Sequence, residues 1–549
     1  GFQMEMKEDS NEYMYKDGML SNDIYSFDNA SGNVIAGEAR SHWSTMGFYA
    51  RLNWNYNNIY FLEFSGRYDG SSRFAAGHRW GFFPSFSAGY DIARTPYFQK
   101  MALPVSQLKV RVSYGRLGNQ NGAGLYDYIA QMPLDAQGTN AWLLPGISSS
   151  TASKGTIAQT PKMISPYITW EKVDNANLGF DLMLFKNRLS ITADLYQRTT
   201  RDMIGPAESI PSISAIASED RAKVNNATLR NRGWELSVSW NDKLKCGFSY
   251  GVGFNVFNYK AVVTKYNNPE GIIYNNHTGL AANKGYYEGM DLGEIWGYRA
   301  DDLFLSNREI DDYLRKVDLT AFKSNDLWRR GDLKYIDTNG DGRVDGGKGT
   351  LSDHGDLQVI GNTTPKYSFG INLNLGYKGF EVSTLLQGVA KRDFPIAGSN
   401  YMFGGNNYNF KEHLDYFSTE NPNGYLPRLT GWKDDKDFLV NTGYNTTRYL
   451  LNAAYMRMKN LTVAYTFNKK QLKHIGISNL KVYVTCDNLF TITKLPKQFD
   501  PETLNQVNMS AGGDAKNTAP GLTSPMKQNG NGMVYPMNRN FVFGLDFTF

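Results

Sequence analysis

Residues 540–549, NFVFGLDFTF, decide the fold of this chain. The odd positions are large and apolar, and the even positions place Val542, Gly544, Asp546 and Thr548 on the other face, which is the two-residue period of a β-strand. In water, such an apolar strand face would promote aggregation. It is stable if that face meets lipid and the strand pairs on both sides to close a barrel. The segment therefore predicts a membrane β-barrel.

The same alternation recurs along the chain. Together with residues 1–7, it predicts fourteen strands, and the thirteen others lie near residues 48–56, 62–68, 86–92, 108–114, 178–184, 189–195, 234–240, 248–256, 367–377, 380–382, 461–467, 480–486 and 541–549. Seven hairpins result, so both ends of the chain are expected on the same side of the membrane.

The predicted connections alternate in length. Four are short turns, at residues 57–58, 186–187, 242–245 and 378–379, whereas residues 117–174, 200–229, 261–366, 391–452 and 494–539 form long loops. Short periplasmic turns and long extracellular loops are typical of outer-membrane barrels, so we expect a periplasmic C-terminus. A soluble β-sandwich or propeller is the alternative. Long loops without secondary structure are uncommon in compact soluble domains and weigh against it.

Composition agrees with a β-rich membrane protein. The chain has 549 residues with 35 Tyr, 31 Phe, 10 Trp and 54 Gly. It contains no apolar run of about 18 residues, which excludes transmembrane helices. The net charge of +5 is near balance and no basic stripe is present, so nucleic-acid binding is not indicated. Cys246 and Cys486 are expected to be small apolar side chains rather than a disulfide.

Short motifs follow one another in a fixed order. They are RYDGSSRF at 67–74, WGFFPS at 80–85, KVRVSYG at 109–115, GNQ at 118–120, WEK at 170–172, DTNGDGRVD at 337–345, IGN at 360–362, RMKNLT at 457–462, DNLF at 487–490 and DPE at 500–502. In this order the chain resembles the SusC/RagA-like TonB-dependent outer-membrane transporters of Bacteroidota. Phe549 likewise resembles the C-terminal aromatic residue that outer-membrane assembly machinery recognises.

The resemblance implies a 22-stranded barrel that is filled by an N-terminal plug, covered by a SusD-like surface lipoprotein and driven by TonB. This chain has no plug, no TonB-contacting segment and about eight strands too few. We therefore expect residues 1–549 to be the C-terminal part of the barrel, with the N-terminal plug and first strands elsewhere. Residues 261–366 are expected to be a long extracellular loop insertion.

Residues 337–345 form the strongest local motif. Side-chain oxygens stand at positions 1, 3 and 5 of an EF-hand-like loop, with Gly342 at the sharp turn. Position 12 is Lys348 instead of an acidic residue, so Asp353 or Asp356 must close the loop, and the family resemblance favours Asp356. The expected ligands of a structural Ca²⁺ are Asp337, Asn339, Asp341, Arg343 through its carbonyl oxygen, Asp345 and Asp356. A metal-free Asx turn is the alternative.

Catalytic motifs are not found. Gly342, Gly347 and Lys348 match part of a phosphate-binding loop, but Gly349 replaces the required Ser or Thr and no strand-to-helix context is predicted. The histidines lack metal-ligand spacing. We therefore expect no enzyme activity.

One outer segment is rich in aromatic residues, namely Tyr401, Phe403, Tyr408, Phe410, Tyr416, Phe417, Tyr425 and Trp432. These rings could stack on a glycan or clamp a peptide, or they could pack the loops together or against the lid protein. The favoured function is active import of a bulky nutrient. A passive porin-like or structural barrel and a soluble β-rich enzyme are the alternatives.

Overall fold

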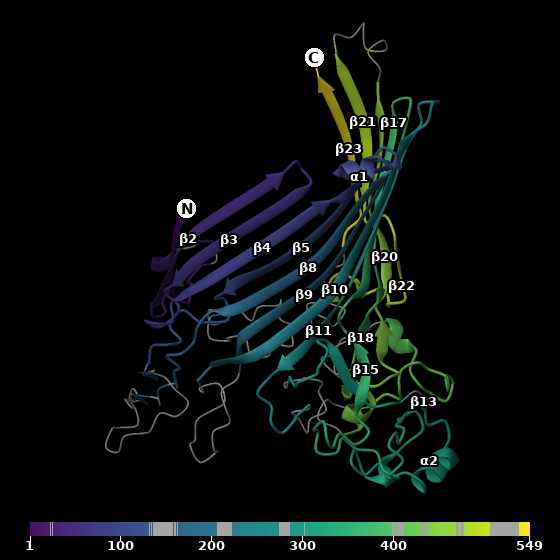
Figure 1. The fold of residues 1–549 in the computed structure, drawn as a ribbon. Coiled ribbons are helices and arrows are strands. Elements are labelled where there is room, and N and C mark those ends of the chain that lie inside the picture. Colours follow the sequence, from purple (N-terminus) through teal and green to yellow (C-terminus); the bar gives the residue numbers. More distant parts are fainter. Residues whose placement is uncertain are drawn as a thin grey trace.

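One large antiparallel sheet dominates the structure. The computed structural model describes residues 1–549 except 22, 25, 131, 133, 136–156, 159–160, 162, 206–221, 274–285, 301, 398–401, 403–410, 431–435, 468–471, 473–476, 505–536 and 549. The strands lie side by side, with short turns at one end of the sheet and the long connections gathered at the other (Figure 1). We call these two ends the turn rim and the loop rim.

The sheet has fifteen strands, and β22 (Thr491–Thr493) lies off the main path because it pairs with β20. In order, the path is β1 (Phe2–Tyr15), β2 (Ile35–Tyr56), β3 (Tyr60–Ser71), β4 (Trp80–Asp91), β5 (Val105–Asn119), β8 (Glu171–Leu184), β9 (Leu189–Gly205), β10 (Val224–Lys243), β11 (Ser249–Lys265), β16 (Lys366–Tyr377), β17 (Phe380–Lys391), β20 (Tyr455–Thr466), β21 (Asn479–Asp487) and β23 (Asn540–Thr548). Each predicted strand falls on one strand of this path, and neighbours in sequence are neighbours in space.

The connections hold only short elements. The paired strands are β6 (Leu134–Asp135) with β7 (Ile157–Ala158), β12 (Glu294–Gly297) with β15 (Gln358–Asn362), β13 (Asp302–Leu303) with β14 (Leu333–Lys334), and β18 (Asp393–Pro395) with β19 (Leu450–Asn452). The helices are α1 (Pro96–Gln99), α2 (Asn307–Leu314) and α3 (Lys436–Phe438), with single helical turns η1 (Phe27–Asn29), η2 (Ile92–Arg94), η5 (Asn325–Leu327), η6 (Lys411–Leu414) and η7 (Leu439–Gly443). Among the described residues, no helix has the length and apolar character needed to cross a membrane.

The register of the strands separates an apolar face from a polar one. Leu52 lies opposite Phe64, and Phe64 lies opposite Phe86, so large side chains line up across β2, β3 and β4. All three are exposed, which places them on what we call the outer face. On the inner face, Arg51 pairs with Glu63 at 2.5 Å. The expected alternation of apolar and polar faces is therefore confirmed.

Ion pairs continue across the inner face. Arg111 lies 2.7 Å from Asp181 and 3.2 Å from Asp194, and so joins β5, β8 and β9. Arg116 lies 2.7 Å from Asp174. Because each pair bridges neighbouring or next-but-one strands, the inner face is charged but locally neutralised. The cysteines Cys246 and Cys486 are both free, as expected.

The tight turns use residues that tolerate a left-handed backbone. Asn57 and Asn58, between β2 and β3, have φ of 50° and 54°, and Lys378 and Gly379, between β16 and β17, have φ of 47° and 93°. Two successive residues of positive φ form the type I′ turn whose twist matches that of a hairpin. The predicted turns at both places are confirmed.

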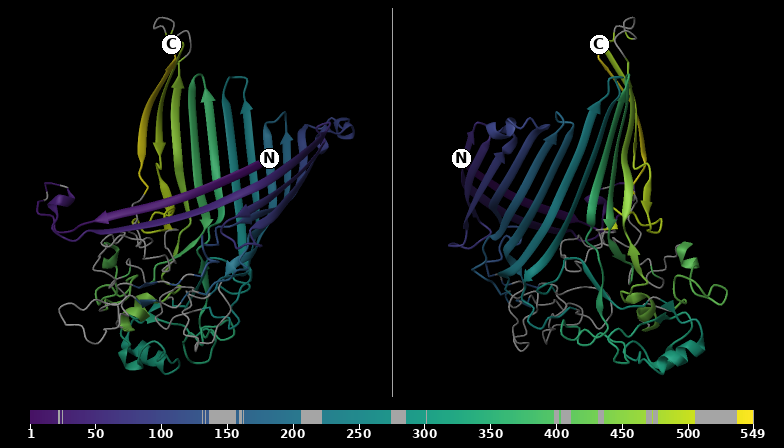
Figure 2. Two further views of the ribbon diagram at one scale, coloured as in Figure 1. Left: turned by 90° about the vertical axis from the view of Figure 1, so that its left-hand side faces the viewer. Right: turned by 45° about the vertical axis from the view of Figure 1, so that its right-hand side comes forward.

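The ends of the strand path remain open. β1 pairs only with β2, and β23 pairs only with β21. In the left view of Figure 2, β1 and β2 (purple) run obliquely across the direction of the C-terminal strands and not alongside them. Closure of a 22-stranded barrel, which the family resemblance implies, therefore remains a prediction that this chain alone does not test.

Several strands extend beyond their predicted bounds at the loop rim. The first strand was expected over residues 1–7, yet β1 continues to Tyr15, and β2 already begins at Ile35. In these extensions, polar residues occupy both faces, so the apolar period that marks a membrane-spanning strand is missing. The sequence pattern locates the part of the strand that faces lipid and does not detect its extension into water.

Replacing Leu52 with arginine should reduce the amount of folded protein in the outer membrane. The new charge would face lipid, where arginine near the bilayer midplane costs about 2–4 kcal/mol. The measurement is the fraction of detergent-extracted protein that keeps its folded, heat-sensitive mobility in gels. The matched control is Asn53→Arg, because Asn53 lies on the inner face opposite Glu63. Equal losses in both variants would contradict the assignment of the faces.

Candidate functional site

The two longest described connections fold together into one domain at the loop rim. Its core combines Phe304, Leu333 and Tyr335 from the β11–β16 connection with Ile396 and Tyr449 from the β17–β20 connection, and all five are almost fully buried. In Figure 1 these connections lie together beyond the end of the sheet, around α2, β13, β15 and β18. The expected long loop is therefore a packed domain, which we call the loop domain.

A buried charge network joins the two connections inside the loop domain. Lys323 Nζ lies 2.8 Å from Asp332 and 2.6 Å from Asp437, and the side chains of Lys323 and Asp332 are both 0% exposed. Arg428 Nε lies 2.6 Å from the other oxygen of Asp332 and also pairs with Asp437. Asn441 donates to Asp332 at 2.9 Å. Two cations therefore neutralise two carboxylates; Lys323 and Asp332 are shielded from water, and Arg428 and Asp437 are partly exposed.

The pKa of Asp437 reflects the charge balance of this network. Burial by itself would raise the pKa of Asp437, but its hydrogen bonds to Lys323 and Arg428 hold the pKa below the usual range. The carboxylate is therefore charged at neutral pH, and Lys323 from one connection keeps two carboxylates of opposite connections together. Removing Lys323 would leave negative charge buried without enough compensation.

Part of the aromatic outer segment contributes to this packing. Phe417 is buried in the loop-domain core, Tyr416 and Tyr425 pack against it, and the Tyr425 hydroxyl donates to the carbonyl of Arg448 at 2.9 Å. For these three rings the structure favours the packing interpretation. The other predicted aromatic residues, Tyr401, Phe403, Tyr408, Phe410 and Trp432, lie outside the described residues.

The family motifs of the N-terminal half meet at the loop rim. Trp170 packs against Phe74 and Phe83 with ring centroids 5.3 and 5.4 Å apart, and its indole N–H donates to the Arg79 carbonyl. Glu171 accepts a 2.6 Å hydrogen bond from Asn119. Four motifs distant in sequence thus form one small core that ties the loops to β3, β4, β5 and β8.

The motifs near the C-terminus also meet. Arg457 lies 2.8 Å from Asp500, with both side chains 4% exposed, and Lys459 lies 2.9 Å from Glu502. Burial would raise the pKa of Asp500, but the hydrogen bond from Arg457 outweighs this and lowers it. The 500–502 motif is thereby held against β20. The motifs that mark the family are, at these positions, anchors between strands and loops.

The candidate metal loop is built from backbone turns capped by side-chain oxygens. Asp337 accepts hydrogen bonds from the N–H groups of Gly340 and Gly342 at 2.6 and 2.8 Å, and both glycines have φ near +80°. Asn339 accepts from the N–H of Asp341, and Asp341 accepts from the N–H of Arg343, each at 2.9 Å. The predicted turn at Gly342 is confirmed.

The structure distinguishes between Asp356 and Asp353, the two residues that were candidates to close this loop. Asp356 is 1% exposed, and its carboxylate accepts hydrogen bonds from the N–H of Thr338 at 2.6 Å and of Asp345 at 3.0 Å, so it bridges the two ends of the loop. Asp353 instead lies 4.0 Å from the exposed Lys348. Asp356 is therefore the residue that is placed to close the loop.

These contacts do not test metal binding. In the part of the chain that the structure describes, no group of three or more His, Cys, Asp and Glu side chains is arranged to hold a metal ion. A Ca²⁺ site would therefore need the amide oxygen of Asn339 and the carbonyl of Arg343 besides the carboxylates. The side chain of Arg343 lies 2.6 Å from Asp345, which engages one of the predicted ligands. Calcium stays a prediction.

A cavity on the inner face at the loop rim is the best candidate for ligand contact. It has a volume of about 560 Å³ and is lined by Leu229, Val263, Tyr266, Tyr286 and Lys265, among others. Apolar walls, two tyrosines and a lysine can bind a ring or acyl surface that carries an anionic group. Its lining residues come from the ends of β9, β10 and β11 and from neighbouring connections, and they show no motif, so sequence reasoning missed it.

A family model described as "TonB dependent receptor-like, beta-barrel" matches residues 5–489. The chain therefore belongs to this family of outer-membrane β-barrel receptors, and the SusC/RagA-like resemblance is confirmed. The family comprises transporters rather than enzymes, in agreement with the expectation that the chain is not an enzyme.

Relatives with similar sequences include TonB-dependent receptor P3 of Formosa agariphila, which is 24% identical over 541 residues that cover 96% of this chain and 48% of the relative. SusC of Bacteroides thetaiotaomicron is 24% identical over 84% of this chain and 42% of the relative. The RagAB peptide importer in its closed-closed state matches all of this chain and 53% of its own, with a TM-score of 0.69 and 20% identity. The chain spans about half the length of the curated relatives it matches.

Replacing Lys323 with methionine should destabilise the loop domain by about 3–5 kcal/mol, because it leaves buried carboxylates without their shared cation. Limited proteolysis of the folded protein over a temperature series measures this loss. Lys334→Met is the matched control. Lys334 pairs with Glu309 at 2.8 Å in a partly exposed position, where a pair contributes about 0–1 kcal/mol. If both variants resisted the protease equally, the network would not hold the domain together.

Proposed function

We propose that this chain is the C-terminal barrel portion of an active outer-membrane importer of a bulky nutrient, either a glycan or a peptide. The similarity over almost the whole chain to TonB-dependent receptors carries the proposal, because it aligns the sheet, the loop rim and the motifs at once. An apolar outer face and an ion-paired inner face suit a barrel wall between lipid and a polar interior. The turn rim and the C-terminus would then face the periplasm.

The rest of the transporter would supply what this chain lacks. An N-terminal plug and further strands would fill and close the barrel, TonB would act on the plug, and a SusD-like lipoprotein would cover the loop domain. The RagAB peptide importer, whose fold matches this chain over its whole length, supports import through such an assembly, and SusC supports the same class of receptor. The inner-face cavity lined by Tyr266, Tyr286 and Lys265 would contact the nutrient on its way inward.

We also propose that residues 337–345 and Asp356 bind a structural Ca²⁺. The support is the turn geometry. Asp337, Asn339 and Asp341 each accept from a backbone N–H two to five residues ahead, and Asp356 bridges the ends of the loop. Carboxylate oxygens have two lone pairs, so an accepted hydrogen bond leaves one free for a cation. The ion would stiffen the loop domain.

Loss of the transporter should abolish uptake of its nutrient, and an uncoupler that collapses the proton gradient should stop uptake by the wild type. Cells that carry or lack the complete transporter gene would be supplied with labelled oligosaccharides and peptides. The physical reason is that opening a plugged barrel requires work from TonB. Affinity purification of the transporter from detergent should also recover a lipoprotein in comparable amount. Uptake that continues with the uncoupler, without any lipoprotein, would favour a passive barrel.

Replacing Asp337 or Asp356 with asparagine should abolish stoichiometric calcium in the purified transporter, because each removes a charged ligand. Metal analysis after extensive dialysis and terbium luminescence are the measurements. Asp353→Asn is the matched control and should retain calcium, since Asp353 does not contact the loop ends. Wild-type protein without calcium above background would refute the site, and the loop would then be a metal-free Asx turn.

A further inference from the structure

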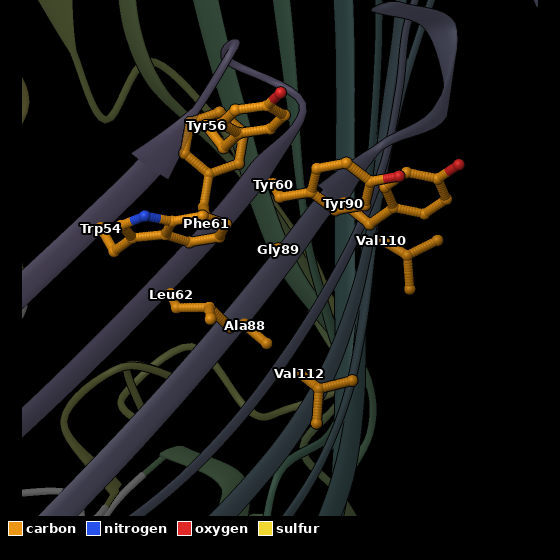
Figure 3. A pocket seen from close by; sticks show the side chains of 10 residues that line it. All are labelled: Trp54, Tyr56, Tyr60, Phe61, Leu62, Ala88, Gly89, Tyr90, Val110 and Val112. Carbon is orange, nitrogen blue, oxygen red and sulfur yellow. The ribbon is translucent and has the colours of Figure 1, made fainter. Parts of the chain in front are cut away.

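The outer face carries a hollow near the turn rim. It has a volume of about 750 Å³ and lies across β2, β3, β4 and β5. Its floor is Ala88, which the register places between Leu62 and Val112. Larger residues surround this small one: Trp54, Tyr56, Tyr60, Tyr90 and Val110. Figure 3 shows the rings on one side of Ala88, which lies between Leu62 and Val112. The hollow is thus a local depression in an otherwise filled apolar face.

Stacked aromatic rings form one wall of the hollow. Trp54 and Tyr56 stack with centroids 6.0 Å apart, Tyr56 and Tyr60 with 6.5 Å, and Tyr60 and Tyr90 with 5.1 Å. In Figure 3 the hydroxyl ends of the three tyrosines lie at one end of the hollow, whereas Ala88 and Val112 lie toward the other. The hollow therefore has an apolar interior and a polar mouth, and the mouth opens toward the turn rim.

The connection between β4 and β5 borders this mouth. It starts directly after Tyr90 and Asp91 and leads into the strand that holds Val110, so it crosses the rim at the hollow. This connection contains Arg94 and Lys100, both exposed, and three exposed apolar residues: Tyr97, Met101 and Leu103. Arg94 pairs with Asp91, whereas no acidic residue lies in residues 92–104. Basic and apolar side chains together are typical of a membrane interface.

Three other described short connections, residues 185–188, 244–248 and 378–379, are basic as well, whereas residues 57–59 carry no charge. The lysines and arginines in these connections are Arg94, Lys100, Lys186, Arg188, Lys245 and Lys378, and none of the connections contains an aspartate or glutamate. Basic residues close to a bilayer attract anionic lipid headgroups. Arg94 and Arg188 pair with Asp91 and Asp242 at the strand ends, so Lys100, Lys186, Lys245 and Lys378 carry the excess positive charge of these connections.

We propose that this hollow binds an anionic phospholipid. One acyl chain lies against Ala88 between the aromatic wall and Val110, and the phosphate group lies at the tyrosine hydroxyls and Lys100. The hollow is continuous with the face that meets lipid, the aromatic rings match the headgroup level of a membrane, and the charge of the rim is complementary to a phosphate. The proposal needs only the orientation of the sheet in the membrane. The lipid site does not depend on whether the protein imports a nutrient.

Quenching of Trp54 fluorescence tests the site, because Trp54 lines the hollow. The complete transporter is reconstituted in phosphatidylcholine vesicles that contain a fixed small fraction of brominated phosphatidylglycerol or brominated phosphatidylcholine. The fluorescence of Trp54 alone is obtained by subtracting the emission of the Trp54→Phe variant from that of the wild type. Brominated phosphatidylglycerol should quench this signal more strongly. Lys100→Gln should weaken the association of phosphatidylglycerol with the hollow, relative to that of phosphatidylcholine, roughly fivefold.

A filling variant and its control complete the test. Ala88→Phe should remove the selective quenching, whereas Ala50→Phe should keep it, since Ala50 is exposed on the same face outside the hollow. Gel mobility checks that both variants fold, and Ala88→Leu serves if Ala88→Phe does not. Equal quenching by the two lipids would overturn the proposal. Absence of quenching by either lipid would also overturn it and would indicate that lipid A or a second copy of the chain covers the hollow.

Discussion

Lipid offers no hydrogen bonds to a polypeptide backbone, and this constraint governs the whole sheet. Every interior strand of the main path pairs on both sides, so its N–H and C=O groups are satisfied within the sheet. Outward side chains such as Leu52, Phe64 and Phe86 can then meet lipid without exposing polar backbone. β1 and β23 each have one free edge. In a membrane both edges need partners, which our proposal supplies from the rest of the transporter.

Charge follows the same division between lipid and water. On the inner face, Arg111 meets Asp181 and Asp194, and at the loop rim Arg457 meets Asp500. In the loop domain the pairs become fully buried, as Lys323 and Asp332 show. Buried pairs contribute little net stability, but they fix which segments meet, because either partner alone would be a buried charge. The loops are therefore specified by charge pairing as well as by their apolar core.

The strands and the tight turns could be predicted from the sequence because both depend on local chemistry. Alternation of side chains marks every lipid-facing segment, and Asn57 and Asn58 form the expected turn. The bounds were too short where β1 and β2 leave the lipid, because the apolar period ends there. The site was predicted in part. Asp356 bridges the ends of the acidic loop through hydrogen bonds, while its role as a metal ligand stays a prediction. The inner-face cavity and the outer hollow were missed because their residues are scattered.

The sequence by itself determined that this chain forms a wall between lipid and water, since a two-residue period fixes which face each side chain takes. It also determined the family, because the motifs stand in a fixed order. Only the tertiary structure decided that these motifs are contacts between strands and loops, and that two long connections make one domain. Those contacts join residues more than a hundred positions apart, such as Lys323 and Asp437, 114 residues apart. Local patterns carry no information about such pairing.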